Sequence, residues 1–214
     1  SMIYLLIAFS QGAAVGAGVI VAQYLGARDK KSVSDAVHTS LVIAGILGIV
    51  LTIAGIVLSR QLLEWMKTPD EVMEQAVTYF RLYSAGMFFG IVYNMAAGIL
   101  NAAGNSKRSL LYLAVASFTN IVLDILFIAI LDMGVAGAAI ATDISQAVSG
   151  ILSMAFLMRV KDSYQVSLKK LKIHRRIAGS MIRVGLPTGI QNMVISLSNV
   201  LVQTSVNGFG AAAM

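Results

Sequence analysis

The sequence predicts an all-α, polytopic membrane protein, a helical bundle with about six transmembrane helices. Hydrophobic residues make up 57% of the 214 residues and charged residues only 12%, whereas a soluble domain normally carries about 25% charged residues. Long apolar runs recur along the chain, and most charged residues lie between them. A lipid-exposed backbone must satisfy its own hydrogen bonds, so we expect each run to be a helix.

Six apolar segments are predicted to span the membrane. Basic residues follow the first segment, Arg60 follows the second, and acidic residues precede the third. A short turn at 132–134 separates the fourth from the fifth, and Pro187 lies at the start of the sixth. The predicted segments are residues 2–25, 35–58, 76–102, 110–131, 135–158 and 186–213. Both chain ends run into apolar segments, so we expect a fragment of a longer protein.

The basic residues predict how the segments are oriented. Alternate loops hold thirteen Lys and Arg residues on one side of the membrane and two on the other. Basic loops face the cytoplasm, so we expect a multi-pass protein of the cytoplasmic membrane whose first segment ends inside. The net charge of +6 therefore does not indicate a nucleic-acid partner. The absence of cysteines excludes disulfides and thiolate metal sites.

Residues 159–185 form a long connection in which apolar residues are interleaved with basic ones. This pattern predicts an amphipathic helix on the cytoplasmic membrane surface, with an ordinary solvated linker as the alternative. A long connection also predicts a boundary between an N-terminal lobe (1–158) and the first helix of a second lobe (186–214). The interleaved apolar positions are Val166, Leu168, Leu171, Ile173, Ile177, Met181 and Ile182.

Polar side chains inside the apolar segments are the candidate site. Asp124 is the clearest, because a carboxylate in the bilayer is costly and by default functional. Asn120 lies one turn earlier on the same helix face. Across the turn centred on Met133, Thr142 should lie level with Asp124 and Gln146 level with Asn120, since helices rise about 1.5 Å per residue.

These oxygens predict a cation site. Carboxylate, amide and hydroxyl oxygens suit Na⁺, and a desolvated carboxylate can carry protons. We therefore assign Asp124, Asn120 and Thr142 to cation coupling, with Na⁺ binding by the same three residues. The alternative is that these groups only hydrogen-bond helices together. Further possible cavity residues are Gln146, Asp143, Tyr93, Asn94, Gln11 and Gln23.

Five short stretches carry a family resemblance. They are VAQYLGARD at 21–29, GILNAAGNSK at 98–107, TNIVLD at 119–124, GAAIAT at 137–142 followed by ISQ at 144–146, and GLP at 185–187 with Gln191. In this order they resemble helices two, four, five, six and seven of multidrug and toxic compound extrusion (MATE) transporters. Gly-x-x-x-Gly pairs at Gly12 and Gly16, and at Gly86 and Gly90, suit a closely packed bundle.

The resemblance implies a twelve-helix, two-lobe exporter of which this chain holds helices two to seven. In the branch similar to DNA-damage-inducible members, the cation site uses an Asn and an Asp on helix five and a Thr on helix six, which match Asn120, Asp124 and Thr142. Its further Asp on helix one has no counterpart here. The chain also lacks the acidic residue that NorM-type members carry on helix seven, since residues 193–199 contain no acid.

The leading hypothesis is a monomeric, cation-coupled (Na⁺ or H⁺) antiporter that exports amphipathic or cationic organic compounds. No cofactor is expected beyond the coupling ion, and the second lobe of the chain is required. The alternative is a lipid-linked oligosaccharide flippase of the same superfamily. An intramembrane aspartyl enzyme using Asp124 and Asp143 is a remote alternative, because neither residue lies in the Tyr-Asp or Gly-x-Gly-Asp motif of such enzymes.

Overall fold

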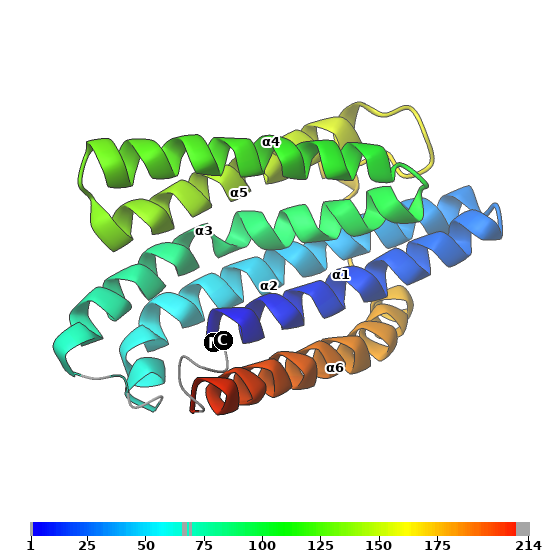
Figure 1. Cartoon of the computed structure of the whole chain (residues 1–214). Coiled ribbons are helices and arrows are strands. Elements are labelled where there is room, and N and C mark those ends of the chain that lie inside the picture. The colour runs from blue at the N-terminus through cyan, green and yellow to red at the C-terminus, as the bar shows by residue number, and fades with distance from the viewer. Residues whose placement is uncertain (1, 66–67, 69, 209–214) are drawn as a thin grey trace.

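The computed structural model describes residues 2–65, 68 and 70–208, and within these residues it contains helices and no strand. Figure 1 shows the helices lying alongside one another as a bundle. In chain order the elements are α1 (Met2–Gly26), α2 (Lys30–Trp65), α3 (Asp70–Ala102), α4 (Ser106–Asp124), the π-helix η1 (Ile125–Ile130), α5 (Gly134–Arg159), the 3₁₀ turn η2 (Leu168–Lys170) and α6 (Arg175–Gly208). The predicted all-α fold is confirmed.

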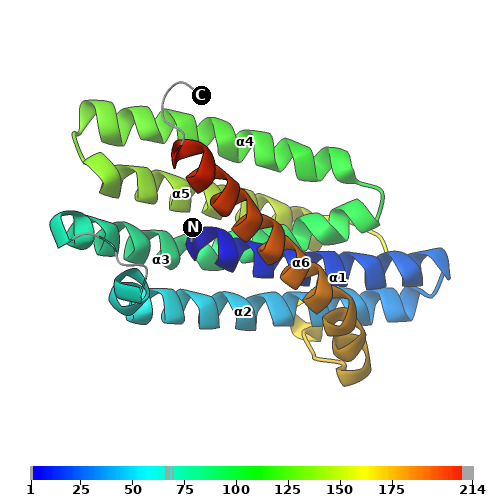
Figure 2. The same cartoon turned by 60° about the horizontal axis from the view of Figure 1, so that its bottom comes forward.

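Helix α3 is the centre of the bundle. It packs against α1, α2, α4 and α5, while α4 and α5 pair at one edge. The last helix, α6, crosses α1 obliquely, as Figure 2 shows, and also touches α2. The residues of the central core are almost all apolar, and Met95, Ile99, Leu100 and Leu157 are fully buried within it.

The outer faces of the bundle are apolar, as expected for a protein in contact with lipid. Phe118 on α4 is 70% exposed, and Leu110 and Ile130 are each 68% exposed. Within the described residues, four helical stretches are long and apolar enough to cross a membrane, namely Lys30–Trp65, Asp70–Ala102, Ser106–Ile130 and Gly134–Arg159. The chain is therefore a multi-pass membrane protein.

Glycines set the closest helix contacts. A Cβ on Gly12 would lie 2.5 Å from the Cα of Gly189, and a Cβ on Gly185 would lie 2.7 Å from the carbonyl oxygen of Gly12. The α1–α6 crossing is therefore a contact of backbone on backbone, which only residues without side chains allow.

The connection between α5 and α6 corrects one prediction. An amphipathic surface helix over 159–185 is wrong for its first half, because residues 160–174 contain only the turn η2 and α6 begins at Arg175. Tyr164 and Val166 are buried, and the Val166 amide donates to the Leu157 carbonyl at 2.8 Å. Tyr164 and Val166 therefore pack into the end of the bundle, whereas Leu168, Leu171 and Ile173 stay exposed. The division into two lobes at this connection stays a prediction.

Candidate functional site

Asp124 and Asn120 lie in the last turns of α4, where the helix changes its hydrogen bonding. The π-helix η1 begins at Ile125, directly after Asp124, and single π turns inside α-helices are frequent at functional sites. Asp124 Oδ1 and Asn120 Nδ2 are both buried and have no hydrogen-bond partner. Buried polar atoms are normally paired. The Asp124 oxygen is therefore available to a cation or a proton, and the Asn120 amide N–H is available to an acceptor.

Thr142 lies on α5, which packs against α4 and η1. Its hydroxyl donates to the carbonyl of Ala138 at 2.9 Å, which leaves the oxygen lone pairs available as an acceptor. No hydrogen bond between side chains joins Asp124 to Thr142 or Asn120 to Gln146 among the described residues. The structure therefore brings the assigned residues onto adjoining helices, and their direct pairing stays a prediction.

The three assigned residues fit a hard cation by their chemistry. They offer carboxylate, amide and hydroxyl oxygens, which are the ligands of Na⁺-like and other hard ions. Within the described part of the chain, no cluster of three or more His, Cys, Asp or Glu residues exists that could hold a metal ion. A cation held near Asp124 would therefore be bound by one carboxylate and neutral oxygens.

The side chains of Asp143 and Gln146 point toward α3 rather than toward Asp124 and Asn120 of α4. The Asp143 carboxylate lies where a Cβ on Gly86 would be, and the Gln146 amide oxygen lies where a Cβ on Gly90 would be. The Gly86–Gly90 pair is therefore a notch in α3 that receives two polar side chains of α5. The orientation of Asp143, which the sequence left open, is toward α3.

A cavity of about 200 Å³ lies between α1, α3, α4 and α5. Four residues assigned to a possible cavity line it together, namely Gln11, Tyr93, Asn94 and Gln146. Gln23 and Asp143 are not in this lining. The Tyr93 hydroxyl donates to the Ser109 carbonyl at 3.2 Å, so it also ties α3 to α4.

Sequence reasoning missed two polar residues of this region. Ser10 lines the same cavity, and its hydroxyl is buried without a partner. Asn192 of α6 lines a second, more open groove of about 490 Å³ with Gln11, Asn94 and Asn101. The only signal for Ser10 was its place beside Gln11, and nothing local distinguished Asn192 from a helix-packing amide.

A third polar cluster lies at the end of α2 opposite its junction with α3. His38 and Thr39 are buried there and hydrogen-bond to the connection between α5 and α6. No sequence pattern groups them with residues 166–174, because more than a hundred residues separate the two segments.

Comparisons with known proteins agree with this architecture. Residues 1–126 match the MatE family model. The chain is 29% identical to the "Probable multidrug resistance protein YoeA" of Bacillus subtilis, over 99% of this chain and 47% of that protein.

Two solved structures of multidrug resistance MATE family transporters are also similar. The inward-facing one has a TM-score of 0.85 at 33% identity and covers 92% of this chain and 45% of the other. The outward-facing one has a TM-score of 0.88 at 31% identity and covers 98% and 47%. The chain spans just under half the length of the proteins that it matches.

Proposed function

Because the chain belongs to the MatE family of membrane transporters, we propose that it is part of a cation-coupled antiporter. Entry of Na⁺ or H⁺ drives export of amphipathic, often cationic, organic compounds across the cytoplasmic membrane. The basic loops face the cytoplasm, and the transporter works as a monomer that includes a second lobe. The relative from Bacillus subtilis is named as a probable multidrug resistance protein, which supports an organic cargo.

The buried, unpartnered carboxylate oxygen of Asp124 carries this proposal. A carboxylate in the bilayer without a partner is unfavourable, so an arriving cation or proton stabilises it. The ion thereby stabilises whichever arrangement of the lobes holds the site closed, and its differential affinity for the two arrangements biases the exchange between them. Thr142 on the adjoining helix supplies a neutral oxygen. The match of these three residues supports assignment to the DNA-damage-inducible branch.

The organic cargo is proposed to bind along α1, α3 and α6. Gln11 and Asn94 line both the cavity and the more open groove, so they lie where the two spaces meet. The walls are mostly apolar with a few amides, which suits amphipathic molecules of varied shape.

Everted vesicles that contain the full-length protein test the proposal. Export of a fluorescent cationic dye is followed under a Na⁺ gradient alone and under a pH gradient alone. We expect one gradient to drive export in the wild type, and Asp124→Asn to reduce it to the level of vesicles without the protein. The matched control is Asp132→Asn, because Asp132 is an exposed carboxylate with φ 51 in the turn before α5, a conformation that Asn tolerates.

Two results would contradict the proposal. Undiminished, gradient-driven export by Asp124→Asn at equal protein level would place the coupling site elsewhere. A wild-type protein that moves no dye under either gradient would contradict drug export and favour the lipid-linked flippase.

A further inference from the structure

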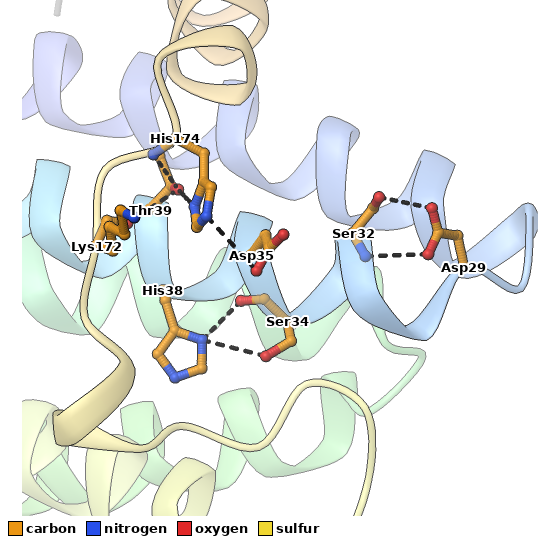
Figure 3. Close-up of polar contacts among 8 residues, drawn as sticks. All are labelled: Asp29, Ser32, Ser34, Asp35, His38, Thr39, Lys172 and His174. Carbon is orange, nitrogen blue, oxygen red and sulfur yellow. Dashed lines mark hydrogen bonds and ion pairs between the residues drawn. The ribbon is translucent and has the colours of Figure 1, made fainter.

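The connector, residues 160–174 between α5 and α6, is fastened to α2 by two adjacent side chains. His38 is 2% exposed and Thr39 is 0% exposed. Figure 3 shows the two side chains leaving α2 in different directions, with Thr39 beside His174 and Lys172. Each hydrogen-bonds to backbone atoms of the connector. These bonds fix the point from which α6 starts.

The hydrogen bonds of His38 require a neutral ring. Nδ1 lies 2.6 Å from the carbonyl oxygen of Ser34, which can only accept, so Nδ1 carries the proton and donates. Nε2 lies 3.0 Å from the backbone nitrogen of Ser167, which can only donate, so Nε2 is unprotonated and accepts. A second proton on the ring would place two N–H groups head to head at Ser167.

Thr39 holds the end of the connector. Its hydroxyl oxygen accepts from the backbone N–H of His174 at 3.2 Å and lies 3.3 Å from the carbonyl oxygen of Lys172, to which it donates. His174 Nδ1 is also 3.3 Å from this hydroxyl, and His174 Nε2 is 3.7 Å from Asp35 Oδ1. None of these hydrogen bonds uses an atom of His38, so protonation of His38 leaves the attachment at Thr39 in place.

The charged groups around this cluster give opposite responses to acid. On α2 the carboxylate is Asp35, which pairs with His174 rather than His38. The connector contributes the cations Lys161, Lys169, Lys170 and Lys172, and α6 begins with Arg175 and Arg176. The one carboxylate of the connector, Asp162, accepts from the Ser163 backbone N–H. No described carboxylate is paired with His38. A charge on His38 is therefore uncompensated, whereas a charge on His174 strengthens its contact with Asp35.

We propose that His38 is a proton-sensitive positioning residue, which holds the connector on α2 while its ring is neutral and releases it at Ser167 when the ring is protonated. Release frees the connector around Ser167, so the start of α6 is then held on α2 by the contacts of Thr39 with Lys172 and His174 alone. For the proposed antiporter, this makes movement of α6 sensitive to cytoplasmic pH. That last step rests on the proposed function, whereas the attachment itself does not.

Hydrogen–deuterium exchange of the connector tests the attachment in the full-length protein in detergent. Peptides covering residues 160–174 are compared at pH 8 and pH 5.5, with rates divided by the intrinsic rate at each pH. The Asp35→Asn background is used to remove the opposing response of His174. Because Nε2 of the attached ring already accepts from Ser167, we expect acid to favour the released state and to lower protection of the Ser167 amide by about tenfold at pH 5.5 relative to pH 8.

The matched variant is His38→Gln. Its amide oxygen takes a place near that of Nε2 and accepts from Ser167, but it does not titrate. We expect protection at pH 8 to be retained and the acid-dependent loss to disappear. The proposal is overturned if the protein with His38 shows no loss of protection at pH 5.5, or if His38→Gln shows the same loss. The readout needs no transport, so it does not depend on whether the protein exports a dye.

Discussion

At Gly86 the absence of a side chain leaves room for the Asp143 carboxylate. A Cβ there would overlap Asp143, and inserting atoms into a packed interior costs about 1–3 kcal/mol. We therefore expect Gly86→Ala to lower the thermal stability of the full-length protein in detergent. Gly45→Ala is the matched control, because a Cβ at Gly45 meets no atom within 4 Å and Ala favours helix by up to about 1 kcal/mol.

A double-mutant cycle identifies the cause. If the added methyl group collides with the Asp143 carboxylate, the double variant Gly86→Ala, Asp143→Ala loses less stability than the sum of the losses in the two single variants. Strictly additive effects would mean that Gly86 is sensitive for another reason. The same logic applies to Gly90 and Gln146, which touch in the same manner.

The sequence placed some site residues better than others. Asp124 and Asn120 share a face because they are four residues apart on one helix, and both have buried atoms without partners. The direction of Asp143 depended on how α5 is rotated against α3, which tertiary packing determines. The pairing of Asp124 with Thr142 assumed straight helices of equal rise, whereas η1 interrupts the α-helix directly after Asp124.

At the scale of the element, Asp29 caps the start of α2. Its carboxylate accepts from the Ser32 backbone N–H at 3.1 Å and from the Ser32 hydroxyl at 2.6 Å. These hydrogen bonds, the hydroxyl first, lower the pKa of Asp29 below its ordinary value. A lowered pKa means that the cap stabilises α2 above about pH 3.9 and is lost as the pH falls through the lowered value.

Exchange at the first turn of α2 measures this cap. We expect the Ser32 amide to lose protection as the pH falls below about 3.9, and Asp29→Asn to show no such step, because Asn caps helices without titrating. The same acid-dependent loss in Asp29→Asn would assign it to another group. The position lies outside the membrane-spanning part of α2, so exchange there can be measured in detergent.

Helices were predicted well, and their ends were not. The six apolar segments lie in helices over the residues that the structure describes, apart from residue 131, since long apolar runs have few alternatives in lipid. Residues 209–213 of the sixth segment lie outside the described residues. The apolar criterion nevertheless ended the second segment at 58, whereas α2 continues to Trp65, because polar residues extend a helix beyond the bilayer. It began the sixth segment at 186, whereas α6 begins at Arg175, within the stretch 159–185 that was predicted as a separate amphipathic helix. The path of the connector depends on its contacts with α2, and no local sequence pattern predicts such long-range contacts.

At the scale of the whole molecule, the chain is similar to transporters solved in two different states. The chain superposes on an inward-facing and an outward-facing MATE transporter with TM-scores of 0.85 and 0.88. The fold of this chain is therefore similar to that of both neighbours, and rigid-body exchange between lobes stays part of the proposed function. The contacts within the bundle should then stay the same during transport. The contacts that attach α6 to the bundle are the ones that test this.

The crossing of α1 and α6 gives the sharpest whole-molecule prediction. A Cβ on Gly185 meets the backbone carbonyl oxygen of Gly12 at 2.7 Å and the Cα of Ala13 at 3.4 Å. Backbone atoms cannot turn aside as a side chain can, so the two helices must separate. We expect Gly185→Ala to lower thermal stability by about 1–3 kcal/mol and to reduce dye export, since α6 then sits away from α1.

Gly179→Ala is the control on the same helix, because a Cβ at Gly179 meets nothing within 4 Å. It should leave both stability and export near the wild-type level. If Gly185→Ala is as stable and as active as Gly179→Ala, α6 tolerates a change in its distance from α1, and the close crossing does not hold the helix. A selective effect of Gly185→Ala would instead identify the crossing as the fixed contact about which the proposed release of the connector allows α6 to move.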